Sequence, residues 1–322
     1  MIPSRALLVG IDDYEYVTPL KGCRQDANDM ANLLERNDDG SKNYECMVLA
    51  SSSVPRVTRT ALRKEWLRLF NNFDGHIAFY FSGHGVFSEF GGYLMTQDAT
   101  QDDPGLAMYE LLQLANDSNA HEVLLILDCC NSGAAGNLPP QRFGMMNQAQ
   151  IREGVTILAA SRPTEVAMIS KGRSIFTSLV LTALIGAAAD IRGHVSAASI
   201  YGFVEQSLGA FDQRPLYKSY AVRLSPVRRC KPEVEDQLLR ELLKFFPTPD
   251  SRYKLDETYE KTSPKAIPEH VAIFDKFKIY RNARLLKTVE HEDLYFAAIN
   301  ATTVELTVQG KAYRGFVEDR RI

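Results

Sequence analysis

Glu122-Val-Leu-Leu-Ile-Leu-Asp-Cys-Cys-Asn-Ser-Gly133 joins an apolar run to a carboxylate, two adjacent thiols and a small polar turn. Buried strands of parallel sheets read as short apolar runs of this kind, and glycine-bearing turns end them. The run from Val123 to Leu127 therefore predicts a central strand, with Asp128, Cys129 and Cys130 at its carboxyl end. In open α/β sheets, ligands bind at that edge.

A second predicted strand ends in the same way. His76-Ile-Ala-Phe-Tyr-Phe81 is followed by Ser82-Gly-His84-Gly85. His84 and Cys130 lie 46 residues apart (130 − 84), a separation that fits a strand–helix–strand unit with the two strands close together. Small residues flank both, so a substrate backbone can come near. The two side chains suit a thiol–imidazole pair; the alternative is a core histidine and an inert buried cysteine.

Strands and helices alternate over about the first 225 residues. The expected strands are 6–11, 46–50, 76–81, 123–127, 155–160 and 220–224, with a hairpin at 92–96. The expected helices are 26–36, 58–73, 108–115, 175–185 and 197–208. This alternation predicts one α/β domain with a mainly parallel sheet between helices. Residues 134–150 are expected to form a long loop.

Length and composition limit the classes of protein. A chain of 322 residues has room for about two domains, and 45% hydrophobic with 24% charged residues is ordinary for a globular protein. The net charge of −3 favours neither nucleic acid nor an anionic membrane. No signal peptide and no membrane-spanning run is expected. The five cysteines form no paired framework, so we expect reduced thiols, no metal requirement and a cytoplasmic location.

Two motifs together suggest a family. Tyr80-Phe-Ser-Gly-His84-Gly and Asp128-Cys-Cys130-Asn-Ser-Gly resemble the paired motifs of the caspase-like cysteine proteases (peptidase C14, clan CD), closest to the metacaspase and bacterial orthocaspase branch. The resemblance covers about residues 4–226 and includes Leu20-Lys-Gly-Cys-Arg-Gln-Asp26-Ala. It implies a caspase-like sheet sandwiched by helices. The animal caspase form Gln-Ala-Cys is absent.

The resemblance implies a role for each residue of the two motifs. Cys130 would be the nucleophile, and His84 its acid/base partner, because a nearby imidazole activates a thiol and can protonate the leaving amine. The backbone N–H groups of Gly85 and Cys130 would form the oxyanion hole. Cys129 should point to the opposite face of the strand and pack there; Cys129 as the nucleophile is the alternative.

Substrate preference follows from the same resemblance. Metacaspases cleave after Arg or Lys and use an acidic S1 pocket, and Asp26, Ser82 and Asp128 match the residues that line it. A desolvated pair of aspartates favours a cation, because a buried charge without a partner is costly. The alternative is that Asp26 caps a helix and that Asp128 is a solvated carboxylate.

Two further features belong to regulation. Asp98, Asp102 and Asp103 are weak candidates for the calcium site that activates many metacaspases; a solvated acidic loop is the alternative, because calcium takes six to eight oxygen ligands. Candidate self-cleavage sites are Arg142 in the long loop and Arg228 and Arg229 near the domain boundary, which are expected to be exposed.

The remaining residues predict a second domain. The break at Ser225-Pro-Val-Arg-Arg-Cys-Lys-Pro232 suggests a peptidase domain at 1–226, a linker at 227–236 and an accessory domain at 237–322. Helices, strand material and a closing helix indicate a small winged-helix-like α+β domain. Residues 236–322 carry 15 Lys or Arg against 14 Asp or Glu, which argues against a nucleic-acid-binding face. One predicted helix gathers Lys276, Lys278, Arg281, Arg284 and Lys287.

The sequence therefore predicts a bacterial caspase-like endopeptidase that cleaves protein substrates after Arg or Lys. By family resemblance it would be a regulated effector in stress, cell-death or phage-defence signalling, with an activating protease or sensor engaging the C-terminal domain. The alternative is a catalytically silent adaptor that presents its winged-helix domain to a protein partner or DNA.

Overall fold

A computed structural model describes residues 2–51, 56–88, 91–129, 150–160, 169–170, 173–208, 215–221 and 225–322. The chain folds into two compact units. The first comprises Met1–Ala189 and His194–Cys230, and the second comprises Asp190–Gly193 and Lys231–Ile322. Each unit has its own buried apolar core.

A six-stranded sheet forms the centre of the first unit, in the order β12-β8-β7-β3-β1-β2. Its strands are β1 (Ser4–Gly10), β2 (Glu45–Ala50), β3 (His76–Ser82), β7 (Glu122–Asp128), β8 (Val155–Ala159) and β12 (Leu216–Ser219). All neighbours pair in parallel except β12, which is antiparallel to β8. The α/β class and the mainly parallel sheet are confirmed.

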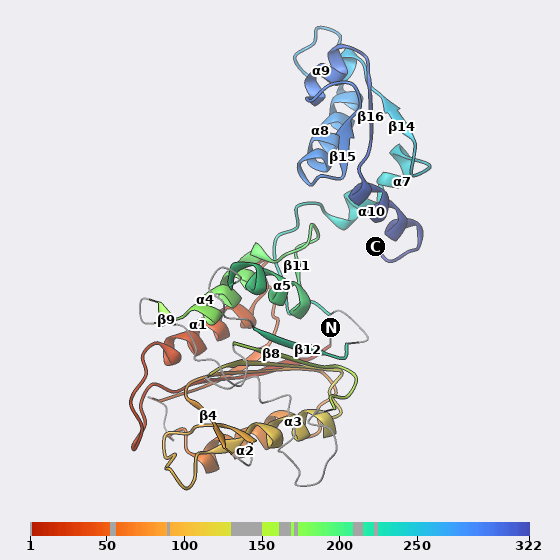
Figure 1. Cartoon of the computed structure of the whole chain (residues 1–322). Helices are drawn as coiled ribbons and strands as arrows, with labels where there is room; N and C mark the ends of the chain where they lie inside the picture. The colour runs from red at the N-terminus through yellow and green to blue at the C-terminus, as the bar shows by residue number, and fades with distance from the viewer. Residues whose placement is uncertain are drawn as a thin grey trace. The chain divides into compact units, whose positions relative to one another are not determined.

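Helices cover both faces of this sheet (Figure 1). One face packs on α1 (Cys23–Glu35), α4 (Ile175–Thr182) and α5 (Ala197–Leu208), and the other packs on α2 (Arg59–Phe70) and α3 (Met108–Asp117). Strand alternation explains the two cores. Along β3, Ala78 and Tyr80 face the α1 side, whereas Phe79 and Phe81 face the α2 side.

Short elements complete the first unit. They are β4 (Gly85–Ser88), β5 (Gly91–Leu94), β6 (Leu106–Ala107), β9 (Ile169–Ser170), β10 (Arg173–Ser174), η2 (Ala183–Ala187), β11 (His194–Val195) and β13 (Arg228–Arg229). Strands β4 and β5 form the hairpin expected near residues 92–96. The last sheet strand was predicted at 220–224 but lies at Leu216–Ser219, because Leu216 and Tyr217 pack on the two cores while Tyr220 is 54% exposed.

Arg228 is buried rather than exposed, and this corrects the sequence prediction. Its side chain is 7% exposed, and β13 pairs with β11 inside the first unit. The guanidinium donates through Nε to the Leu33 and Arg36 carbonyls (3.0 and 3.1 Å) and through Nη1 to the Leu184 carbonyl (2.9 Å). Helix ends leave carbonyls without intrahelical donors, and Arg228 supplies donors at the end of α1. Arg229 remains exposed.

The second unit is built on a three-stranded antiparallel sheet in the order β14-β16-β15. Its elements are α6 (Asp236–Arg240), α7 (Leu242–Phe245), β14 (Arg252–Lys254), η4 (Glu257–Tyr259), α8 (Pro268–Asn282), β15 (Leu286–Thr288), α9 (Leu294–Ile299), β16 (Thr303–Leu306) and α10 (Val308–Glu318). The similarity of this unit to winged-helix domains stays a prediction.

Four of the five basic residues expected on one helix form ion pairs with carboxylates. Ion pairs join Lys276 to Glu241 (2.6 Å), Lys278 to Asp275 (2.9 Å), Arg281 to Asp293 (3.3 Å) and Lys287 to Glu305 (3.1 Å). The single predicted helix is wrong for two of them, because α8 ends at Asn282: Arg284 follows it with a positive φ of 59°, and Lys287 lies in β15. In the described part of the chain, no helix is both long and apolar enough to cross a membrane.

Candidate active site

The carboxyl ends of three neighbouring strands form the candidate active site. Gly10 of β1, Ser82 of β3 and Asp128 of β7 stand side by side in register. The ladder runs one step further, because the Gly83 N–H donates to the Asp128 carbonyl at 3.3 Å. Gly10 allows α1 to approach closely: a Cβ there would lie 2.2 Å from the Cys23 carbonyl oxygen.

His84 lies two residues beyond the end of β3, and its main chain and its ring each make one hydrogen bond. Its main-chain N–H donates to the Tyr14 hydroxyl at 2.7 Å, and the Tyr14 ring centroid lies 4.9 Å from that of the imidazole. The ring atom Nε2 lies 2.8 Å from the Thr18 carbonyl oxygen. A carbonyl can only accept, so Nε2 carries a proton, and the tautomer compatible with this contact has its lone pair on Nδ1. The Thr18 contact thus fixes the orientation of the imidazole.

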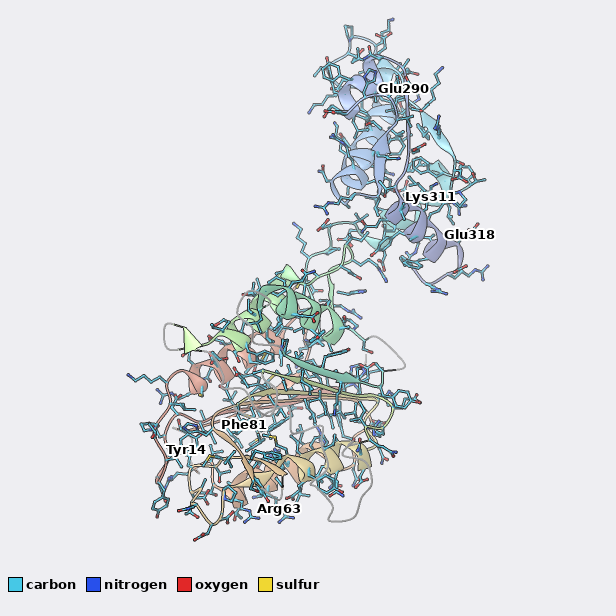
Figure 2. All side chains as sticks on the ribbon, in the orientation of Figure 1. Tyr14, Arg63, Phe81, Glu290, Lys311 and Glu318 are labelled. Atoms are coloured by element: carbon cyan, nitrogen blue, oxygen red, sulfur yellow. The ribbon has the colours of Figure 1, made fainter. Side chains whose placement is uncertain are left out.

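The Tyr14 side chain packs against Gly83. Tyr14 and Phe81 are labelled in Figure 2. A Cβ on Gly83 would lie 2.7 Å from the Tyr14 hydroxyl, so a larger residue at this position of the motif would displace that side chain. Burial raises the pKa of Tyr14, with a smaller opposing effect from the His84 backbone hydrogen bond. The hydroxyl therefore stays neutral and accepts from the His84 N–H.

Several predicted residues lie outside the described part of the chain. Cys130 and Arg142 belong to the segment 130–149, so the thiol–imidazole distance and the Cys130 N–H remain predictions. Gly85 is described: it begins β4 and is in register with Leu94. Cys129 is 2% exposed and packs in the core on the α2 side of the sheet, as strand alternation predicts.

The predicted S1 residues come together on the opposite face, beside α1 and α4. Asp26 is 1% exposed, Ser82 2% and Asp128 4%, so all three are withdrawn from water. Asp128 Oδ2 accepts from the Thr177 hydroxyl at 2.5 Å. Burial raises the pKa of Asp128, and hydrogen bonds from Ser174 and Thr177 partly oppose this. Asp128 is therefore no solvated carboxylate.

Asp26 and Cys23 contribute to the same cluster from the first turn of α1. The Cys23 thiol hydrogen-bonds the Ser82 side chain, and burial raises its pKa to about 12, with Asp12, Asp128 and Asp26 adding to the rise. Helix α1 is capped by Asp12, whose carboxylate accepts from the Cys23 N–H at 2.8 Å. Asp26 is therefore not the cap, and it is buried within the cluster.

Sequence reasoning did not identify five of the residues that support the site: Tyr14, Thr18, Cys23, Ser174 and Thr177. Cys23 had a usable signal, because it lies three residues before Asp26 and so shares its helix face. Thr18 acts through its carbonyl, which every residue type carries. Thr177 comes from a helix far along the chain, and only the fold brings it to Asp128.

Thr177 connects Asp128 to Tyr80, and we expect its replacement to destabilise the fold. The Tyr80 hydroxyl lies 2.6 Å from Thr177 Oγ1. The Thr177 hydroxyl has one proton and donates it to Asp128, so it accepts a hydrogen bond from Tyr80. Thr177→Val leaves two buried polar groups without this partner, so the free energy of unfolding should fall by about 2 kcal/mol. Urea denaturation measures it. Thr177→Ser keeps the hydroxyl and should lose less; equal losses would refute the hydrogen-bonding role.

The calcium candidates are largely committed to protein contacts. Asp98 Oδ1 accepts from Thr96 Oγ1 (2.7 Å) and from the Arg59 N–H (2.9 Å), and Asp103 pairs with the Arg59 guanidinium at 2.7 Å. Across the described ranges, no three His, Cys, Asp or Glu residues stand close enough to hold a metal. The described residues thus do not fit a calcium site, and Asp102 stays a sequence candidate only.

Comparisons with known proteins agree with this architecture. The caspase domain of peptidase family C14 matches residues 3–224. A crystal structure of a Geobacter sulfurreducens protein superimposes with a TM-score of 0.53 at 14% identity, covering 71% of this chain and 100% of that one. Caspase-1 from Spodoptera frugiperda gives a TM-score of 0.49 at 13% identity, covering 71% and 91%. No curated protein matches the sequence significantly.

Proposed function

The chain belongs to the caspase-domain family of peptidases, and on this premise we propose that it is a cysteine endopeptidase that cleaves proteins after arginine or lysine. The observation that carries the proposal is the buried Asp128, in register with Ser82 at the strand edge that leads into His84. A carboxylate withdrawn from water at the strand edge that carries the proposed catalytic residues suits recognition of a cationic side chain at the scissile bond.

The proposed chemistry divides between the two motifs. His84 takes the thiol proton at Nδ1, and the Cys130 sulfur attacks the scissile carbonyl carbon. The N–H groups of Gly85 and Cys130 stabilise the negative oxygen of the tetrahedral intermediate. His84 then gives its proton to the departing amine, which leaves an acyl-enzyme. Water attacks the acyl carbon after His84 removes its proton, and the thiol is regenerated. The Thr18 carbonyl keeps the ring in the orientation that these transfers need.

Charge explains the proposed selectivity. Asp26 and Asp128 are both nearly inaccessible to water, and burial raises the pKa of Asp128. A guanidinium or ammonium between them offsets the cost of burying ionised carboxylates, whereas a P1 aspartate adds a third negative charge. The arrangement therefore disfavours cleavage after aspartate, the P1 residue that animal caspases prefer.

Peptides that differ only at P1 test the proposal. We expect turnover with Arg and Lys at P1 and at least about 100-fold less with Asp, because placing a like charge in this pocket costs several kcal/mol. Release of a fluorophore measures it, with and without calcium and at several pH values. Faster cleavage after Asp would refute the specificity. No turnover of any peptide would favour the adaptor alternative.

The physiological role is the part of the proposal that rests most on the family. An effector role in bacterial stress, cell-death or phage-defence signalling, with the second unit engaging a sensor or an activating protease, is what the family resemblance supports. Self-processing next to Arg228 conflicts with its burial, whereas Arg229 is exposed. The self-cleavage proposal is thus restricted to Arg142 and Arg229.

A further inference from the structure

The second unit contains a pocket of about 220 Å³ that the peptidase chemistry does not use. It opens between α8, α9 and the residue that follows η4. The residues that matter to it are Glu260, Phe274, Lys278, Arg281, Asp293 and Tyr295. Pockets for cofactors and metabolites are typically about 300–1,000 Å³, so this one suits a single side chain.

Glu260 gives the pocket its chemical character. The residue is 6% exposed, although carboxylates are almost never buried without a partner. Its Oε1 accepts from the Thr262 N–H (3.3 Å) and from Thr262 Oγ1 (3.2 Å). Among the described residues, no Lys, Arg or His forms an ion pair with it. A buried carboxylate that lines a pocket thus lacks a counter-ion.

The two cations of the pocket are already neutralised. Lys278 Nζ lies 2.9 Å from Asp275 Oδ1 and 4.8 Å from the Phe274 ring centroid. Arg281 pairs with Asp293 at 3.3 Å and donates to the Glu292 carbonyl at 2.6 Å. The charge of Glu260 therefore remains uncompensated. A cationic group entering the pocket would gain a charge-assisted hydrogen bond and offset the cost of burial.

An exposed apolar surface adjoins the pocket. Tyr295, Phe296 and Ile299 of α9 are 43, 55 and 40% exposed. Spacings of three and four residues place them on one side of the helix, and the rings of Tyr295 and Phe296 meet edge to face at 5.3 Å. Rigid aromatic side chains beside a charged pocket are characteristic of protein-binding hot spots.

We propose that this pocket is a docking site for a partner protein, which inserts a lysine or arginine side chain toward Glu260. A neighbouring apolar residue of the partner packs on Tyr295, Phe296 and Ile299. Charge selects this occupant, because an acidic peptide or a nucleic acid would meet an uncompensated carboxylate. The site requires no peptidase activity, so it stands or falls separately from the proposed function.

A peptide selection tests the docking site. Random peptides are selected on the full-length chain carrying His84→Ala and Asp128→Asn, so that the first unit neither cuts peptides nor holds their basic residues. We expect enrichment of Arg or Lys beside an apolar residue. The best peptide is labelled, and its affinity is measured by fluorescence polarisation for this background, for Glu260→Gln and for Glu290→Gln. Glu290 is an exposed carboxylate of the same unit (Figure 2).

Glu260→Gln should weaken binding by at least about 30-fold, because it removes one member of a buried charge pair. Glu290→Gln should leave the affinity within about twofold. Changing the peptide's arginine to citrulline, which is neutral and nearly the same shape, should reproduce the loss without altering the protein, so the test survives if Glu260→Gln does not fold. No basic enrichment, or equal binding of the arginine and citrulline peptides, would overturn the proposal.

Discussion

His84→Ala is expected to lower kcat/KM for an arginyl peptide by about 1,000-fold or more. The substitution removes both the base that activates the thiol and the acid that protonates the amine, and general acid–base catalysis alone contributes about 100- to 10,000-fold. The fold should be unaffected, because the main-chain N–H that donates to Tyr14 is still present. Initial rates at saturating and limiting peptide measure the loss, which should fall mainly on kcat.

His121→Ala is the matched control for this prediction. His121 is exposed and immediately precedes β7, at the opposite end of that strand from Asp128. The activity of the His121→Ala variant should stay within about twofold of that of the parent protein. Alkylation of the thiol by iodoacetamide provides a second measurement, because loss of the imidazole should slow it at neutral pH. If His84→Ala kept most of its activity, the role of the first motif would be wrong.

Asp128→Asn is expected to abolish the preference for basic P1 residues. The amide keeps the shape of the side chain but removes its charge, so kcat/KM for an arginyl peptide should fall by about 30- to 1,000-fold. Cleavage after a neutral P1 residue should change little, because the imidazole and its Tyr14 and Thr18 contacts are elsewhere. Asp117→Asn, at an exposed carboxylate at the end of α3, is the control. Unchanged arginyl kinetics would show that Asp128 does not line S1.

The raised pKa of Asp128 adds a pH dependence with a defined sign. Between its ordinary value of 3.8 and the raised value, the folded protein binds a proton that the unfolded chain has released. Stability should therefore fall as pH rises through this window, and Asp128→Asn should flatten that slope. In the same window, the KM for arginyl peptides should rise as the pH falls, because protonation removes the charge that the substrate needs. Urea midpoints and KM values across this range measure both effects.

The parts of the fold that could be predicted from sequence follow from local patterns. Apolar runs defined the parallel strands, and helical spacing of Leu62, Trp66 and Leu69 defined α2. The residue alternation that separates Asp128 from Cys129 was readable in the same way, and the structure confirms it. Local pattern sufficed for β1, β3, β7 and β8 because these strands are buried on both faces.

The contacts that support the site could not be predicted, because they depend on backbone atoms or on distant elements. Thr18 contributes a carbonyl, which leaves no trace in residue type. Thr177 reaches Asp128 across 49 residues of sequence. The burial of Arg228 was missed for a similar reason. A basic stretch flanked by prolines is typical of an exposed linker, but the Arg228 guanidinium donates to carbonyls that lie 195 and 192 residues earlier in the chain.

The position of Arg228 determines where the first unit can be separated from the second. The caspase-domain match ends at residue 224, but Arg228 donates to the last-turn carbonyls of α1, the helix that also carries Asp26. An excised peptidase cut at residue 226 would lose β13 and would leave these carbonyls without donors. Truncation there should loosen the far end of α1, the helix whose first turn carries the proposed S1 residue Asp26. An excised domain should extend through Cys230, and the family boundary is thus a poor guide to the folding boundary.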